Sequence, residues 1–264
     1  MTEALAVGTS LILRLARDAR DLRAAQRLRY EVFVQELGAT GASVDHAAQL
    51  ERDAYDAHFD HLLLIDTRRD PDLLQDVVGA YRLLPPERVA SAGGYYSENE
   101  FDLGELRASG RRLVELGRSC VHRDLRGGAA MFLLWNGLAE YVLERGIEVM
   151  FGAASFHGTD GAALAKPLSY LHHFHRAPVG LRVTARPEHR LDLAPLPQDQ
   201  LTRAEAMAGI PPLIKAYLRL GGHVSDGAWV DQDFNTIDLC LVMDTARMSV
   251  KHRDFYIRKK GRDG

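Results

Sequence analysis

The chain has 264 residues, 46% hydrophobic and 26% charged, which is enough to bury the core of one large globular domain or two small ones. Its two cysteines, Cys120 and Cys240, each lie in an apolar run, which argues against a disulfide framework and fits a reducing compartment. A formal net charge of −3 says little about partners, but a chain that is not basic overall disfavours nucleic acid.

Membrane and targeting signals are also weak. No apolar run approaches the roughly 18 residues of a membrane span, and the first 16 residues have no basic stretch before their short apolar part. We therefore expect a cytoplasmic protein.

Strands and helices alternate in the first part of the chain. The hydrophobic pattern predicts a strand over Leu11–Ala16, a helix over Asp21–Glu36 and two strands over His61–Ile65 and Val77–Leu84. Residues 87–110 contain Gly93-Gly94, Tyr95-Tyr96 and Gly104, and they predict a long irregular loop of the kind that often serves function.

The second part continues the alternation. It predicts a strand over Arg112–Val121, a helix over Ala129–Glu144, a strand over Ile147–Phe151 and a helix over Ala162–His175. A long connection over Ala177–Pro212 follows, with a helix over Arg203–Ala208. The last predicted elements are a strand pair over Ile214–Leu220 and Ile237–Met243. This order indicates a mixed α/β sheet. No composition shift marks a domain boundary, so we expect a single domain.

The segment Asp124-Leu-Arg-Gly-Gly-Ala129 separates the predicted strand and helix in the middle of the chain. A glycine-rich turn at a helix start offers bare backbone N–H groups to an anion such as a phosphate. The segment lacks the Gly-Lys-Ser/Thr ending of a Walker loop, and by itself it could be a simple strand-to-helix turn.

Two charged residues, Glu115 and Arg118, precede this loop in the same strand. Strict alternation would place them on opposite faces, but a bulge at Gly117 would bring them to one side. They could form a scaffolding ion pair, or they could act on a substrate. Their position just before the glycine loop favours the second interpretation.

Other polar groups leave alternatives open. The acidic set Glu51, Asp53 and Asp56 could be solvated or could bind a cationic amine, and the three histidines at 172, 173 and 175 are more typical of satisfied side chains than of a zinc site. The tail over residues 247–264 is basic, and it could meet an acidic protein or an anionic membrane surface, or remain a solvated terminus.

These motifs resemble known families. The strand, loop and helix resemble motif A of the GNAT acyltransferase fold, with Gly127 and Ala129 fitting its pattern and Asp124 standing where Gln or Arg is usual. An ordered series resembles the ornithine lipid synthase family, the L-ornithine N-alpha-acyltransferases: Arg29-Tyr-x-Val-Phe33, Glu51-x-Asp53-x-Tyr55-Asp56, Gly79-x-Tyr-Arg82-Leu-Leu84, Glu100-Phe101 and Glu115-Leu-Gly-Arg118. A looser version is similar to the acyl-homoserine-lactone synthases.

The resemblance implies a single GNAT-like domain over residues 1–264 that moves a 3-hydroxyacyl group from acyl carrier protein to the α-amine of L-ornithine. It implies Glu115 and Arg118 as catalytic residues, and no metal or cofactor beyond the carrier's phosphopantetheine. Carrier contacts would fall on Val121, Arg126, Gly127, Gly128 and Ala129, and substrate contacts on Arg29, Phe33, Asp53, Asp56, Arg82 and Phe101. The alternatives are an acyl-homoserine-lactone synthase, an N-acyltransferase for glycine, glutamine or lysine, a GNAT enzyme that uses acetyl-CoA, and a catalytically silent binding module.

Overall fold

A computed structural model describes residues 5–7, 10–127 and 129–247 of the chain. It divides into two compact units: unit 1 comprises residues 1–94 and 116–147, and unit 2 comprises residues 95–115 and 148–264. The single-domain prediction for residues 1–264 stays a prediction. Gly128 and residues 248–264, which include most of the basic tail, lie outside the described residues.

Unit 1 contains an antiparallel series in the order β1-β2-β5-β6, formed by Leu5–Val7, Leu11–Leu15, Asp60–Asp66 and Val77–Leu84. The strand β8 (Leu113–Val121) contributes its residues from Leu116 onward to this unit. Shorter elements complete unit 1: β3 (Val44–Asp45), β4 (Leu50–Glu51), η2 (Ala54–Ala57), η3 (Pro86–Arg88), α2 (Val89–Ala92) and η5 (Arg123–Leu125).

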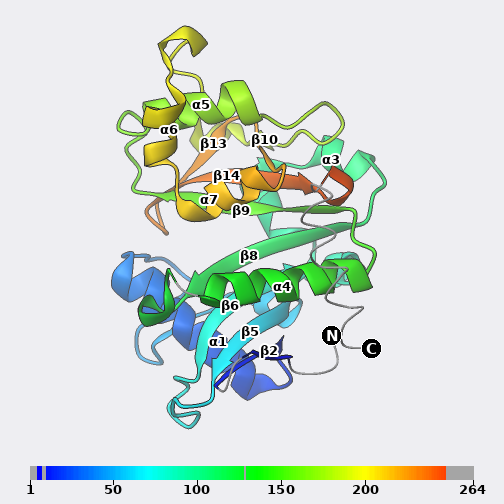
Figure 1. The fold of residues 1–264 in the computed structure, drawn as a ribbon, viewed down its shortest axis with the longest axis vertical. Coiled ribbons are helices and arrows are strands. Elements are labelled where there is room, and N and C mark those ends of the chain that lie inside the picture. Colours follow the sequence, from blue (N-terminus) through cyan, green and yellow to red (C-terminus); the bar gives the residue numbers. More distant parts are fainter. Residues whose placement is uncertain (1–4, 8–9, 128, 248–264) are drawn as a thin grey trace. The chain divides into compact units, whose positions relative to one another are not determined.

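Two helices cover opposite faces of the unit 1 strands. Helix α1 (Ala19–Arg29) packs Ala24, Ala25 and Leu28 against the face that carries Leu63. Helix α4 (Ala129–Glu144) runs along β5 and β6 (Figure 1) and packs against the alternate residues, because its Gly137 lies against Leu62. The predicted helix over residues 129–144 is confirmed.

The predicted helix over Asp21–Glu36 is confirmed with a difference. It is α-helical only to Arg29 and continues as a π-helix, η1, over Tyr30–Glu36. Such wider turns are rare and frequently occur at functional sites.

Unit 2 is built on a mixed group of strands. The first residues of β8, Leu113–Glu115, pair in parallel with β9 (Val149–His157), and β9 pairs antiparallel with β14 (Thr236–Asp244) along its whole length. β13 (Ala228–Asp231), β12 (His223–Val224) and β11 (Arg190–Leu191) extend this group. Parallel and antiparallel pairs occur together, so the predicted mixed α/β class is confirmed.

The other elements of unit 2 are short. They are η4 (Tyr96–Asn99), β7 (Phe101–Asp102), α3 (Gly104–Ala108), α5 (Ala165–His175), β10 (Thr184–Ala185), η6 (Pro187–His189), η7 (Gln198–Gln200), α6 (Arg203–Gly209), α7 (Pro212–Arg219) and η8 (Thr245–Arg247).

Two predictions need correction here. Residues 87–110 are not one irregular loop, because α2, η4, β7 and α3 occupy most of them. The stretch Ile214–Leu220 is not a strand: residues 214–219 belong to α7, which begins at Pro212 directly after Pro211, since proline at a first helical turn favours a helix start. The C-terminal strand pair exists, but β13 rather than residues 214–220 pairs with β14.

Candidate active site

Six charged side chains of unit 1 contact one another, and we call them the buried ion network: Arg29, Glu51, Asp53, Asp56, Arg82 and Arg118. Four of the six are at most 4% exposed. The side chains of Arg118 and Asp53 are 12% and 16% exposed and form the accessible end of the network.

These six groups come from five separate elements. Arg29 ends α1, Glu51 lies on β4, Arg82 lies on β6, and Arg118 lies on β8. Asp53 caps η2, where Asp56 completes a capping box, so the turn itself fixes both carboxylates.

Arg29 is the centre of the network. It donates from Nη1 to Asp56 Oδ1 at 2.7 Å and from Nη2 to Asp56 Oδ2 at 2.9 Å, and it also binds the Glu51 carboxylate. Burial alone would raise the pKa of Asp56, but the charge and hydrogen bonds of Arg29, aided by Arg82, hold that pKa far below its usual range. Asp56 is therefore ionised at neutral pH.

Arg82 and Arg118 complete the network. Arg82 Nη1 donates to both oxygens of Asp53, at 2.7 and 2.8 Å, and its guanidinium stacks 4.4 Å from the centre of the Phe59 ring. Arg118 makes longer contacts, 3.3 Å from Nε to Glu51 and 3.4 Å from Nη2 to Asp53. Arg118 has a φ of +50°, an unusual backbone conformation for a non-glycine residue that often marks functional sites.

The network is electrically balanced, with three guanidinium groups and three carboxylates. The carboxylates of Asp53 and Asp56 thus already bind arginines, and holding a substrate amine would require them to exchange partners. Their predicted substrate contact stays a prediction. Glu51, which belongs to the acidic set but not to the predicted site, is the fully buried partner that sequence reasoning left out.

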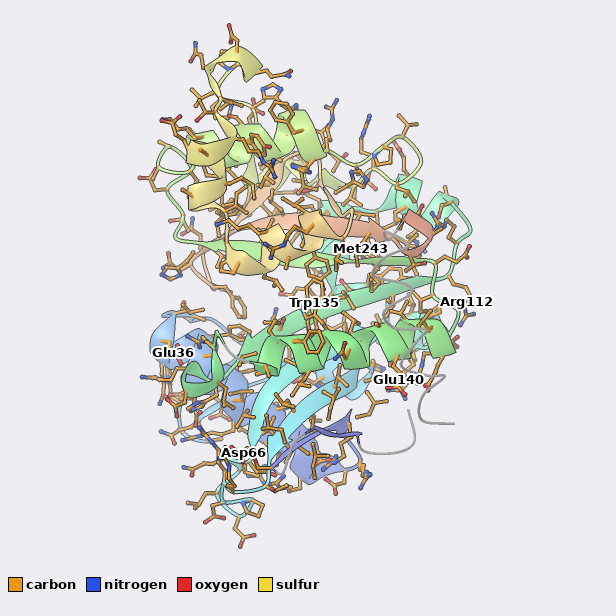
Figure 2. All side chains as sticks on the ribbon, in the orientation of Figure 1. Glu36, Asp66, Arg112, Trp135, Glu140 and Met243 are labelled. Atoms are coloured by element: carbon orange, nitrogen blue, oxygen red, sulfur yellow. The ribbon has the colours of Figure 1, made fainter. Side chains whose placement is uncertain are left out.

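The predicted carrier loop follows β8. Gly127 has a φ of +75°, which favours glycine, and Ala129 begins α4; the first N–H groups of a helix have no partner within the helix itself. Arg126 donates to the Val121 carbonyl oxygen and pairs with Glu36 at 2.8 Å. Glu36, labelled in Figure 2, ends η1. The Arg126 side chain is 46% exposed and can reach an anion in solvent.

Glu115 belongs to unit 2 and is 1% exposed. One carboxylate oxygen accepts the N–H of Tyr96 at 2.8 Å and the other accepts the N–H of Ser97 at 2.6 Å, at the start of η4. Burial, followed by the negative charge of Glu115, raises the pKa of Tyr95 to about 12. Glu115 therefore anchors the segment that begins at Tyr95, and its role as a general base stays a prediction.

The two aromatic candidates occupy different settings. Phe33 is partly buried against the apolar cluster beneath α1, whereas Phe101 is fully buried in unit 2. Cys120 is also buried, which raises the pKa of its thiol to about 12 and disfavours it as a nucleophile.

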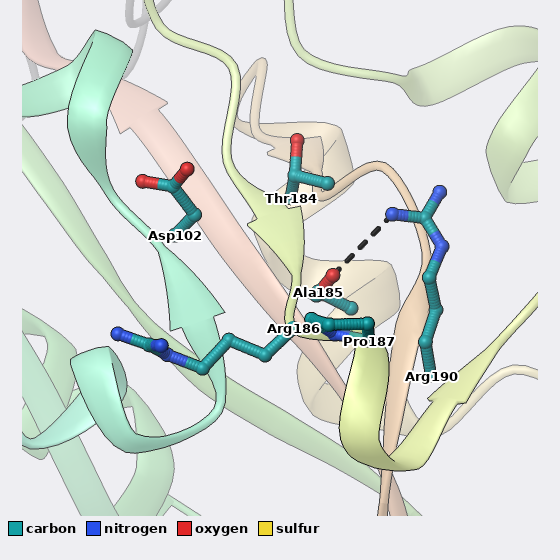
Figure 3. Close-up of a pocket in the computed structure, with 6 residues that line it drawn as sticks. All are labelled: Asp102, Thr184, Ala185, Arg186, Pro187 and Arg190. Atoms are coloured by element: carbon teal, nitrogen blue, oxygen red, sulfur yellow. Dashed lines mark hydrogen bonds between the residues drawn. The ribbon is translucent and has the colours of Figure 1, made fainter.

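Unit 2 contains two further features that sequence reasoning missed. A pocket of about 490 Å³ is lined by Asp102, Thr184, Ala185, Arg186, Pro187 and Arg190; Figure 3 shows Asp102 and Arg190 on opposite sides of β10. The carboxylates of Glu100, Asp231 and Asp238 approach one another closely, and we call them the carboxylate cluster. The sequence signal for this cluster was Asp238, which lies within the apolar run of β14, because an aspartate is rarely buried unless it is paired.

Among the described residues, the carboxylate cluster is the one group of three or more histidine, cysteine or acidic side chains close enough to share an ion, so the three histidines of α5 do not form such a group. No helix in the described part of the chain has the length and apolar character required to cross a membrane.

A family model and two relatives that resemble this chain are all acyltransferases. The model of the acetyltransferase (GNAT) domain matches residues 28–136. An L-ornithine N(alpha)-acyltransferase of Rhodobacter capsulatus is 58% identical over 247 residues, which cover 94% of this chain and 95% of that protein. The enzyme of the same name from Rhizobium meliloti is 42% identical, with 96% of this chain and 86% of that protein covered.

A solved structure has a similar fold. A CoA-dependent acyl-homoserine lactone synthase, BjaI, is 17% identical with a TM-score of 0.50, and the match covers 92% of this chain and 83% of that one. At this identity the likeness concerns the fold alone.

Proposed function

The chain belongs to the family of L-ornithine N(alpha)-acyltransferases, and from that membership we propose that it transfers a 3-hydroxyacyl group from acyl carrier protein to the α-amine of L-ornithine. The observation that carries the proposal is 58% identity with a relative of that name across nearly the full length of both chains. The product is lyso-ornithine lipid, to which a separate acyltransferase would add a second chain.

The reaction is a direct aminolysis. The neutral α-amine attacks the thioester carbonyl carbon, the new C–N bond forms, and the C–S bond breaks to release the carrier thiol. Because an α-amine is mostly protonated at neutral pH, it must lose a proton before or during the attack. No metal or redox group takes part in this scheme.

The loop after β8 supports donor binding. Arg126 offers a half-exposed guanidinium beside the start of α4, and the N-terminus of a helix suits an anion such as the phosphate of phosphopantetheine. Val121 supplies the carbonyl oxygen that orients Arg126. Binding of this phosphate would compete with Glu36 for the guanidinium.

The proposed catalytic roles follow from where the residues lie along β8 and in the buried ion network. We assign proton removal to Glu115, directly or through water, and stabilisation of the oxyanion to backbone N–H groups of β8 near Arg118, where the backbone departs from regular strand geometry. Arg118 and Asp53, at the accessible end of the buried ion network, orient the acceptor, while Arg29, Asp56 and Arg82 hold them in place. Phe33 and Phe101 are assigned apolar substrate contacts.

The test uses the purified full chain with two donors, a 3-hydroxyacyl carrier protein and the matching CoA thioester. Ornithine, glycine, glutamine, lysine and S-adenosylmethionine are offered as acceptors, and mass spectrometry identifies each product. We expect N-acyl-ornithine from the carrier donor at the highest kcat/KM. Faster acylation of another amino acid, or product formation only with S-adenosylmethionine, would contradict the proposed acceptor; equal use of the CoA donor would contradict the proposed carrier dependence.

Contact between the basic tail at 247–264 and an anionic membrane is a separate proposal, which rests on the sequence. Co-sedimentation of the full chain with anionic and neutral vesicles tests it.

A further inference from the structure

The carboxylate cluster of unit 2 brings three negative groups together. One carboxylate oxygen from each of Glu100, Asp231 and Asp238 lies within 4.8 Å of the other two, and Glu100 and Asp238 are 4% and 5% exposed. The three come from different elements: Glu100 precedes β7, Asp231 ends β13, and Asp238 lies within β14. Carboxylates this close and this buried repel one another when ionised, and a shared proton or a bound cation relieves that repulsion.

A buried hydroxyl gives a second, independent indication of a ligand. Thr236 is 8% exposed, and its Oγ1 has no hydrogen-bond partner among the described residues. It is the register partner of Asp231 across β13 and β14, and it lies two residues before Asp238, so all three side chains share one face of the strands. An unsatisfied hydroxyl beside the cluster is a further acceptor for a ligand that donates hydrogen bonds.

The same face is open to solvent next to the cluster. On β9, Ser155 is the register partner of Asp238, and His157 is the partner of Thr236, and both are exposed. Trp229, the partner of Asp238 on β13, is partly buried and adds an aromatic surface that suits methylene groups and a nearby cation. A ligand can therefore approach along the strands and place a cationic end among the carboxylates.

We propose that the carboxylate cluster, with Thr236, binds the side-chain ammonium of the amino-acid acceptor. The inference rests on the proposed function, because it assigns a place to the second amine of ornithine. A primary ammonium has three N–H donors, which three carboxylates and one hydroxyl can accept. A divalent ion is the alternative occupant, since carboxylate oxygens are also its ligands, and the experiment below separates the two.

The proposal explains which amine reacts. An ammonium held by carboxylates keeps its proton, because neighbouring negative charge favours the charged form, and its lone pair stays unavailable for attack. The α-amine then remains the nucleophile. The carboxylate cluster would thus select a cationic side chain and also direct acylation away from it.

The experiment compares L-ornithine with L-norvaline, which has the same carbon chain without the side-chain amine. We measure kcat/KM for both acceptors with the purified full chain and with the variants Asp238→Asn, Glu100→Gln and Thr236→Val. Asp199→Asn is the control, since Asp199 is exposed in η7 of the same unit. Mass spectrometry of the product gives the fraction acylated on the side-chain amine.

We expect the ratio of kcat/KM for ornithine to kcat/KM for norvaline to fall about 10–100-fold in Asp238→Asn and Glu100→Gln, which lose a charged acceptor of the ammonium's hydrogen bonds. In Thr236→Val, which loses a neutral acceptor, this ratio should fall about 3–10-fold. Side-chain acylation should rise in the two carboxylate variants, and Asp199→Asn should retain the wild-type ratio. Equal losses for both acceptors would overturn the proposal, as would a stoichiometric divalent ion that the wild type holds and Asp238→Asn lacks.

Calorimetry separates this proposal from the proposed function. If the wild type acylates neither acceptor, the proposed function fails, but titration with ornithine and norvaline still tests the site. Tighter binding of ornithine, lost in Thr236→Val, would support the site without catalysis. Equal binding of the two amino acids would overturn it.

Discussion

The substitution Arg29→Met tests whether the buried ion network stabilises unit 1. Methionine keeps much of the side-chain volume but removes the charge that Glu51 and Asp56 share, and these carboxylates are 0% and 4% exposed. Breaking a buried pair by removing one partner costs about 3–5 kcal/mol. Because Arg82 still contacts Asp56 and Arg118 still contacts Glu51, we expect a loss near the lower end, about 3 kcal/mol in the free energy of unfolding.

The control lies on the same helix. Arg27 pairs with Glu31 at 3.1 Å in an i,i+4 arrangement, with both side chains 22% exposed, and it also donates to Gln49 in an exposed contact, so Arg27→Met should cost only about 0.5–1 kcal/mol. The chain has two tryptophans, and Trp135 lies in unit 1 while Trp229 lies in unit 2. In a Trp229→Phe background, urea unfolding followed by fluorescence therefore reports on unit 1.

A loss in Arg29→Met no greater than that in Arg27→Met would refute the reasoning, because it would mean that the two carboxylates are solvated or protonated at no cost. The double variant Arg29→Met with Glu51→Gln sharpens the test. It removes one of the carboxylates left without Arg29 and should be less destabilised than the sum of the two single variants.

Four other outcomes are expected. Glu115→Gln leaves one carbonyl oxygen for two backbone N–H groups and should lower kcat about 10²–10⁴-fold and alter the acid limb of the pH–rate profile; an unchanged profile would remove Glu115 from the base role. Arg126→Ala should raise the KM of the carrier donor more than its control Arg123→Ala, which also pairs with Glu36, and a fall confined to kcat would contradict the phosphate contact. Burial lowers the pKa of His61, so below about pH 6.5 the unfolded chain takes up a proton that the folded chain does not. The urea midpoint of the wild type should therefore decrease as the pH is lowered through that range, and it should decrease less steeply in His61→Gln. Gly137→Ala would place a Cβ 2.6 Å from Leu13 Cδ2 and should cost about 1–3 kcal/mol, measured by the same urea titration.

Local sequence signals were sufficient to predict an element where the pattern is compatible with only one kind of secondary structure. The apolar stripe of residues 129–144 predicts α4 with its correct ends, and the apolar run of residues 77–84 predicts β6. They failed where two solutions compete: Ile214–Leu220 has apolar residues that suit a strand, but the two prolines before it start a helix. The turn at Asp53 and Asp56 was visible only as an acidic segment, although the spacing of its capping residues is a known signature of a helix start.

The sequence by itself determined the family, the mixed α/β class and the residue types of the site, because ordered motifs and periodicity are properties of a linear chain. Only the tertiary structure decided how charges pair. Arg29, Asp56 and Arg82 are far apart in sequence, and their contacts arise from the packing of α1, η2 and β6. The carboxylate cluster likewise depends on the register of β13 and β14, which fixes where Asp231 and Thr236 meet and which local sequence does not encode.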